Sequence, residues 1–196
     1  MKLGIGMVAA ALGLAIAAVP LDAQQRDLVL SVYGGGADHL ADFQNNPPVW
    51  LMPGSNLGAS VGLRLNEHFT VRGDFTYARN PSRGHALFAG SDIVHFYYGV
   101  QLEGRYPLGS LAPFVLVGVG AASVDQQGVD QFDPFTKPAV MLGGGIAYLI
   151  PRTPLEAFGA VKGISYKWDR VGFDRQLFDV IYSLGLSYRA PVTLPF

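Results

Sequence analysis

The chain has 196 residues, no cysteine, 49% hydrophobic residues and a formal net charge of −1. The lack of cysteine excludes disulfide scaffolds, thiolate catalysis and cysteine-bound metals, and the balanced charge gives no reason to expect nucleic acid as a partner. Beyond residue 23 no apolar run reaches the roughly 18 residues that a membrane-spanning helix needs, so a helical membrane protein is not expected.

The first 23 residues have the pattern of a cleaved signal peptide. Lys2 gives a positive start, residues 3–19 form an apolar core rich in Ala, Gly and Leu, and Leu21-Asp22-Ala23 forms a small-residue cleavage site before Gln24. The alternative is a retained membrane anchor, which the short, alanine-rich core disfavours. We therefore predict a signal peptide over residues 1–23 and a single folded domain over residues 24–196.

Turn residues divide the remaining chain into eight predicted strands. These are expected near residues 27–36, 55–65, 69–79, 93–106, 113–124, 138–150, 155–168 and 177–190. Three short turns, at 66–68, 107–112 and 151–154, alternate with four longer loops, at 38–54, 80–92, 125–137 and 169–176. Outer-membrane barrels have short periplasmic turns and long outer loops, so both ends of the barrel chain are expected on the periplasmic side.

Most of these segments alternate apolar and polar residues. In the last strand the side expected to face outward consists of Phe178, Val180, Tyr182, Leu184, Leu186 and Tyr188. Strands of about ten residues suffice to cross a bilayer when tilted, and an even number can close without leaving an edge in lipid. The predicted fold is all-β, an eight-stranded antiparallel up-and-down transmembrane β-barrel that follows a cleaved signal peptide.

Two strands depart from this alternation. The fifth is apolar on both parities from Phe114 to Val119, which would equally suit a buried strand in a soluble sheet. In the seventh, Lys162 shares its parity with four residues that we expect to face lipid, Phe158, Ile164, Tyr166 and Trp168. An ammonium in lipid costs about 2–4 kcal/mol, so we predict that a bulge at Gly163 turns Lys162 inward.

Aromatic residues are expected to form a girdle at each water boundary of the barrel. The outer girdle would contain Tyr77, Phe96, Tyr98, Tyr166, Trp168 and Phe178. The inner girdle would contain Phe69, Tyr106, Phe114, Tyr148, Tyr188 and Phe196. The main rival is a soluble lipocalin-like barrel, which would instead gather Leu63, Phe75, Leu102 and Leu184 around its centre.

Three segments resemble the small OmpA-type outer-membrane β-barrel domains, including the stand-alone OmpX-like members. They are the run Pro-Phe-Val-Leu-Val-Gly-Val-Gly-Ala at 113–121, the run Leu-Gly-Gly-Gly-Ile-Ala-Tyr at 142–148, and the tyrosine-rich final strand that ends at Phe196. The resemblance covers essentially all of 24–196. It implies a bacterial outer-membrane location among outer-membrane lipids, and insertion by the assembly machinery that recognises a C-terminal strand ending in an aromatic residue.

Pro191 and Pro195 depart from this pattern, because proline cannot donate a ladder hydrogen bond. The final strand must therefore stop near Ala190, or its end must lie beside a neighbour that does not need those donors.

The barrel interior is predicted to hold a polar network of near-cancelling charge. Its members are Arg64, Arg72, Asp74, Glu103, Arg105, Glu156, Lys162, Asp179 and Arg189. An eight-stranded ring is about wide enough for side chains to fill. We interpret the set as a static network that compensates buried charge, in preference to an ion path or a gate, and expect negligible steady conductance.

No catalytic residue, cofactor or metal site is predicted. His39 and His85 fall in outer loops, His68 in a tight turn and His95 at the top of the fourth strand, and no pair has metal-ligand spacing. Because some eight-stranded outer-membrane barrels are lipid A deacylases or acyltransferases, His95 with Ser91 and Asp92 is a candidate hydrolytic set. Its parity places His95 in the lumen, away from acyl chains, and the His-aromatic-Ser signature of the deacylases is missing.

The predicted role is that of a non-enzymatic outer-membrane barrel, a monomer that serves envelope structure or surface interaction. Extracellular partners would be met through loops 38–54 and 125–137, the first carrying an apolar cluster and the second several acids. For the first loop we favour folding over the rim or resting in the headgroup layer over a protein-binding patch, and the second lacks the spacing of a calcium loop. The alternatives are a lipid A deacylase-like enzyme and a narrow pore or carrier for small molecules.

Overall fold

The computed structural model describes residues 25–40, 44–45, 48–84, 91–127, 134–169 and 175–193. These residues form strands β1 (Gln25–His39), β2 (Gln44–Asn45), β3 (Pro48–Leu51), β4 (Gly54–Arg64), β5 (Phe69–Gly84), β6 (Asp92–Arg105), β7 (Leu111–Gln127), β8 (Phe135–Leu149), β9 (Leu155–Trp168) and β10 (Arg175–Thr193). Within them there is no helix long and apolar enough to cross a membrane. The predicted signal peptide, 1–23, lies outside the described residues.

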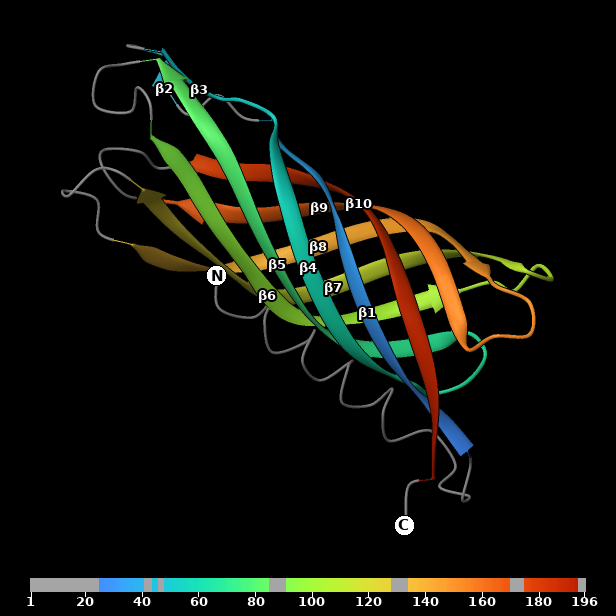
Figure 1. Ribbon diagram of the computed structural model, residues 1–196. Coiled ribbons are helices and arrows are strands. Elements are labelled where there is room, and N and C mark those ends of the chain that lie inside the picture. The colour runs from blue at the N-terminus through green and yellow to red at the C-terminus, as the bar shows by residue number, and fades with distance from the viewer. Residues whose placement is uncertain are drawn as a thin grey trace.

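Eight of the strands close into an antiparallel barrel (Figure 1). The order around the ring is β1, β4, β5, β6, β7, β8, β9, β10, and each strand pairs with the next one along the chain. The last strand, β10, pairs with β1 from Gln25 opposite Thr193 to His39 opposite Asp179. The pairing of β5 with β6 completes the ring. All eight predicted strands are therefore confirmed, and each barrel strand is paired on both sides.

The outer surface of the barrel is apolar. Leu57, Val115 and Leu142 are each 66% exposed and Leu184 is 75% exposed, while the alternate positions of the same strands are buried or half-buried. Phe75 also points outward, with Leu63 and Leu102 half-buried on the same outer face. A band of exposed aliphatic side chains around a closed ring is what lipid requires, and the lipocalin-like alternative is wrong.

The fifth predicted strand, which is β7, is apolar on both faces because one face points into the lumen and the other points outward. Phe114 and Leu116 are buried inside the barrel, and Val115, Val117 and Val119 are exposed outside. An eight-stranded lumen is too narrow for bulk water, so both faces of one strand can be apolar.

The prediction for the seventh strand, β9, was wrong. Ile164, Tyr166 and Trp168 are buried inside the barrel together with Lys162, and Phe158 packs against buried residues of the inner lumen. No bulge intervenes, because β9 stays in unbroken register with β10, where Gly163 faces Val180 and Lys162 faces Ile181. The whole face points inward, so Lys162 needs no change of phase.

The predicted aromatic girdles were partly wrong, because three of their members point into the lumen. Tyr166 and Trp168 belong to the lumen and not to the outer girdle, and Phe114 belongs to the lumen and not to the inner one. The remaining girdle residues on the outer surface include Tyr98 and Phe178 towards one end and Phe69, Tyr148 and Tyr188 towards the other. Phe196 lies outside the described residues.

The final strand does not stop at Ala190. β10 continues through Pro191, opposite Asp27 of β1, to Thr193. The backbone N–H of Arg189 donates to Pro154 on the β9 side, so by alternation the nitrogen of Pro191 also faces that side. Because β9 begins only at Leu155, no ladder acceptor is left there, and proline costs no strand hydrogen bond. Pro195 lies outside the described residues.

The short turns at one end of the barrel occur as predicted, and the other end is more elaborate than expected. β5, β7 and β10 have 16, 17 and 19 residues, which is longer than the 9–11 that a tilted strand needs to cross a bilayer. At the loop end β3 pairs with the extension of β5, with Trp50 opposite Arg83, and β2 pairs with β3. Figure 1 shows this small sheet continuing the barrel wall beyond its neighbours.

Candidate functional site: the filled lumen

Charged residues occupy the inner half of the lumen, towards the short turns. The Arg105 guanidinium reaches Glu156 at 2.8 Å and Glu103 at 2.6 Å, and Arg72 forms a further close ion pair with Glu103. The contacts to Glu156 are bidentate, at 2.8 and 3.0 Å. Since all four side chains are nearly buried, these charge-assisted bonds replace the water that each group has lost.

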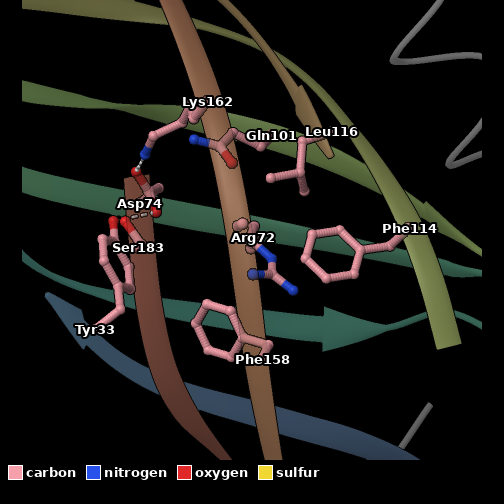
Figure 2. Close-up of a pocket in the computed structure, with 10 residues that line it drawn as sticks. Tyr33, Arg72, Asp74, Gln101, Phe114, Leu116, Phe158, Lys162 and Ser183 are labelled. Atoms are coloured by element: carbon pink, nitrogen blue, oxygen red, sulfur yellow. Dashed lines mark hydrogen bonds and ion pairs between the residues drawn. The ribbon is translucent and has the colours of Figure 1, made fainter. Parts of the chain in front are cut away.

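A second ion pair, between Lys162 and Asp74, lies farther along the lumen, and Figure 2 shows the two side chains pointing toward one another. Lys162 Nζ is 2.5 Å from Asp74 Oδ1 and 3.0 Å from Thr76 Oγ1. The Tyr33 hydroxyl donates to Asp74 Oδ2 at 2.7 Å. These groups border a cavity of about 30 Å³, which has room for about two water molecules.

The outer half of the lumen is closed by apolar side chains. This apolar plug comprises Ala37, Ala78, Ile93, Tyr97, Ala122, Val124, Phe135, Ala139, Met141, Ile164, Tyr166, Trp168, Leu177 and Ile181. It draws on seven of the eight barrel strands, and Leu51 of β3 packs against it from the first outer loop. Part of that loop therefore folds over the rim.

A polar cluster is embedded in the apolar plug near the outer rim. His39 forms a close ion pair with Asp179, which also accepts a hydrogen bond from the Tyr97 hydroxyl. The His95 ring lies 4.7 Å from that of His39 and stacks on Tyr97 at 5.5 Å. We expected His39 in a solvated loop, but it ends β1 and its side chain is only 4% exposed.

The nine residues of the predicted polar network thus fall into separate groups. Arg72, Glu103, Arg105 and Glu156 form the inner network, Asp74 and Lys162 form the central pair, and Asp179 joins the histidines. Arg64 lies 3.8 Å from Asp27, a residue the prediction omitted. Arg189 is close enough to Glu156 to attract it, but no ion pair to Arg189 occurs among the described residues.

The three residues considered as a hydrolytic set, which we did not predict to be catalytic, take separate positions. Ser91 Oγ lies 3.1 Å from Ser82 Oγ and accepts from Gln126 at 2.9 Å, while Asp92 accepts from Arg79 Nε at 2.7 Å. In the part of the chain that is described, neither His95 nitrogen has a hydrogen-bond partner. The geometry therefore joins none of the three residues of the weighed hydrolytic set to another.

Two features of the outer loops can be placed. Lys137 and Asp169 form a 2.5 Å ion pair at the loop end, and this hydrogen bond lowers the pKa of the Asp169 carboxyl below its usual value. Asp125 belongs to β7. His85, Asp130 and Asp133 lie outside the described residues.

These features define an integral β-barrel of the outer membrane, with a lipid-facing apolar band and a filled lumen. The model of the outer membrane protein β-barrel domain family matches residues 8–189, and the chain belongs to this family. The predicted resemblance and bacterial outer-membrane location are confirmed.

Solved structures share the fold at low sequence identity. The crystal structure of Neisserial surface protein A (NspA) is 15% identical with a TM-score of 0.60, over 84% of this chain and 99% of that one. OprG from Pseudomonas aeruginosa is 13% identical with a TM-score of 0.54, over 86% and 97%. Ail of Yersinia pestis, solved in complex with the heparin analogue sucrose octasulfate, is 17% identical with a TM-score of 0.51, over 85% and 99%. No curated protein matches the sequence significantly.

Proposed function

We propose that this protein is a non-enzymatic, non-conducting outer-membrane barrel that acts in envelope structure or in surface interaction through its outer loops. The observation that carries the proposal is a lumen in which buried side chains occupy both halves over the described residues. Buried ion pairs occupy its inner half, and the apolar plug occupies its outer half. A cavity with room for about two waters is no path for solutes, which leaves the outer surface as the place of action.

The loop end supports a role at the cell surface. The β5 extension and its partner β3 carry hydrogen-bonded backbone beyond the length that lipid requires. Binding residues are commonly held on loops that a rigid scaffold positions. We propose loops 38–54 and 125–137 as the contact regions, a monomeric barrel, and insertion by the outer-membrane assembly machinery through the C-terminal strand.

Replacing the first outer loop distinguishes a role in surface interaction from a role in envelope structure. Ala37 of β1 and Gly54 of β4 are register partners, so a short Gly/Ser linker in place of residues 40–52 can close the hairpin without β2 and β3. Heat-modifiable migration on gels checks that the variant folds. Loss of adhesion with an intact permeability barrier supports surface interaction, and loss of the barrier only in the complete deletion strain supports an envelope role. A deletion strain that matches wild type in both assays refutes the proposal.

The non-conducting part of the proposal is tested by planar-bilayer recording of the purified protein. We expect no large, stable open channels, and such channels would contradict the filled lumen. The enzyme alternative predicts lipid A deacylation that His95→Ala abolishes. The pore or carrier alternative needs a lateral gap between strands or a continuous lumen, and the hydrogen-bonded pairing of neighbouring barrel strands over the described residues supports our proposal against a lateral gap.

A further inference from the structure

We propose that His39, His95 and Asp179 form a binding site for a divalent transition-metal ion, Zn²⁺ in the first instance, near the outer rim of the lumen. One ligand atom from each side chain lies within 4.8 Å of the others. Two imidazoles and a carboxylate are a ligand set that zinc uses, and the nitrogen donors disfavour Ca²⁺ and Mg²⁺, which take oxygen.

The strand register builds this site. His39 and Asp179 are direct partners in the β1–β10 ladder, so their side chains emerge side by side on the inner face. His95 enters from β6, which is separated from β1 by β4 and β5 in the ring. An ion held by all three would tie two sides of the barrel together across the lumen.

His95 provides the observation that points to a ligand. Its side chain is completely buried, and neither ring nitrogen has a hydrogen-bond partner within the described residues. A buried polar group without a partner is costly, and such groups are uncommon enough to need a cause. A metal ion between His95 and the His39–Asp179 pair would provide the missing partner for one of those nitrogens.

The surroundings also suit a metal. The Tyr97 hydroxyl donates to Asp179, which is the kind of outer contact that orients a metal-binding carboxylate. Ligand atoms of tetrahedral zinc lie about 3.3 Å apart, so binding would bring His95 towards the His39–Asp179 pair and separate the ligand atoms of that pair, with a water molecule as the fourth ligand. The adjoining Leu40 is 64% exposed, so the site lies one residue from solvent at the end of β1.

The test uses untagged protein refolded in detergent and stripped of metal. Co²⁺ is titrated while its visible d–d absorption is followed, and Zn²⁺ is then added as a competitor. We expect one equivalent of Co²⁺ to bind and Zn²⁺ to displace it. His95→Ala is expected to weaken binding at least about 100-fold, and Tyr97→Phe about 10- to 100-fold. His68→Ala is the matched control, because that histidine is in a half-exposed turn at the other end of the barrel.

Heat-modifiable migration shows whether each variant is folded. Where His95→Ala does not fold, His95→Gln and Asp179→Asn replace it and are expected to show the same loss. The proposal is overturned if the wild-type protein binds neither ion, or if the folded His95 variants bind as tightly as wild type. It is also overturned if His68→Ala removes the absorption while the His95 variants retain it.

Discussion

Replacing Asp74 with asparagine is expected to destabilise the barrel by about 3–5 kcal/mol, the usual cost of removing one partner from a buried ion pair. Lys162 would keep its charge at 7% side-chain exposure, and its close partners would be the Thr76 hydroxyl at 3.0 Å and a neutral amide oxygen in place of the carboxylate. The adjoining cavity has room for about two waters, too few to restore the hydration of an ammonium group.

The converse substitution should cost less. Lys162→Met leaves the Asp74 carboxylate with a hydrogen bond from Tyr33 at 2.7 Å and a weaker one from Thr76 at 3.3 Å. We expect a loss of about 2 kcal/mol, within the range for a partly satisfied buried group. In the double variant no orphan ammonium remains, so it should be more stable than Asp74→Asn alone.

The assay is reversible urea unfolding of the refolded protein in lipid vesicles, followed by tryptophan fluorescence. Asp27→Asn is the matched control, because Asp27 lies 3.8 Å from Arg64 and is 33% exposed, and such a pair contributes about 1 kcal/mol or less. A loss below about 1 kcal/mol for Asp74→Asn, or a double variant as unstable as the sum of the single ones, would refute the reasoning.

Three further predictions use matched pairs of variants. Leu184→Arg, at a lipid-facing position midway along β10 with 75% exposure, should cost about 2–4 kcal/mol in the same unfolding assay, whereas Leu108→Arg in a short turn should cost about 0–1 kcal/mol; equal costs would contradict the placement in lipid. Gly145→Ala would put a Cβ 2.1 Å from the Gly159 carbonyl oxygen and should cost about 1–3 kcal/mol of stability or more, whereas Gly73→Ala, with no atom nearer than 3.9 Å, should be near neutral. A larger loss of stability for Gly73→Ala than for Gly145→Ala would be evidence against the close β8–β9 spacing. Lys137→Ala should raise the pKa of Asp169 back towards its ordinary value in a carboxyl NMR titration, because Lys137 now lowers it; the small stabilisation from this pair is present above the ordinary carboxyl pKa and lost as pH falls through the lowered one, and an unchanged titration would show that the pair does not form.

The number and order of strands could be predicted from the sequence because lipid imposes a strict condition on outward residues. What failed was the assumption that the inward face must be polar. In β9 the residues Ile164, Tyr166 and Trp168 are as apolar as any lipid-facing set, yet all three are buried in the lumen. Alternation with a period of two separates the two faces of a strand. When the barrel interior holds no bulk water, the inner face need not be polar, so polarity does not show which face points inward.

Lys162 was the informative residue in that strand. Its charge belongs inside, so the apolar residues that share its parity belong inside with it. We preferred to move one residue with a bulge, and the continuous register of β9 shows that all of them should have been moved. A single costly charge was therefore better evidence for the direction of a face than several apolar neighbours.

Contacts across the lumen could not be predicted, because they depend on how far each strand is staggered against the next. Asp74 of β5 meets Lys162 of β9, and Tyr97 of β6 meets Asp179 of β10, although each pair is widely separated in the chain. The proposed metal ligands come from three strands, so spacing along any one strand gives no signal. Once β1 and β10 are known to be neighbours, the pairing of His39 with Asp179 follows from counting residues along the ladder.

The two halves of the lumen limit permeation by different means. An ion entering from the short-turn side would meet the network of Arg72, Glu103, Arg105 and Glu156, whose exchange of partners could let charge pass without exposing apolar surface. Apart from the cluster of His39, His95, Tyr97 and Asp179, the apolar plug has no such option, because a permeating ion would have to leave its hydration shell among side chains that offer few replacement ligands. Charge-neutralising substitutions in the inner network should therefore leave the barrel closed. Any opening that creates a path must displace the plug, and the His39–Asp179 pair lies within it.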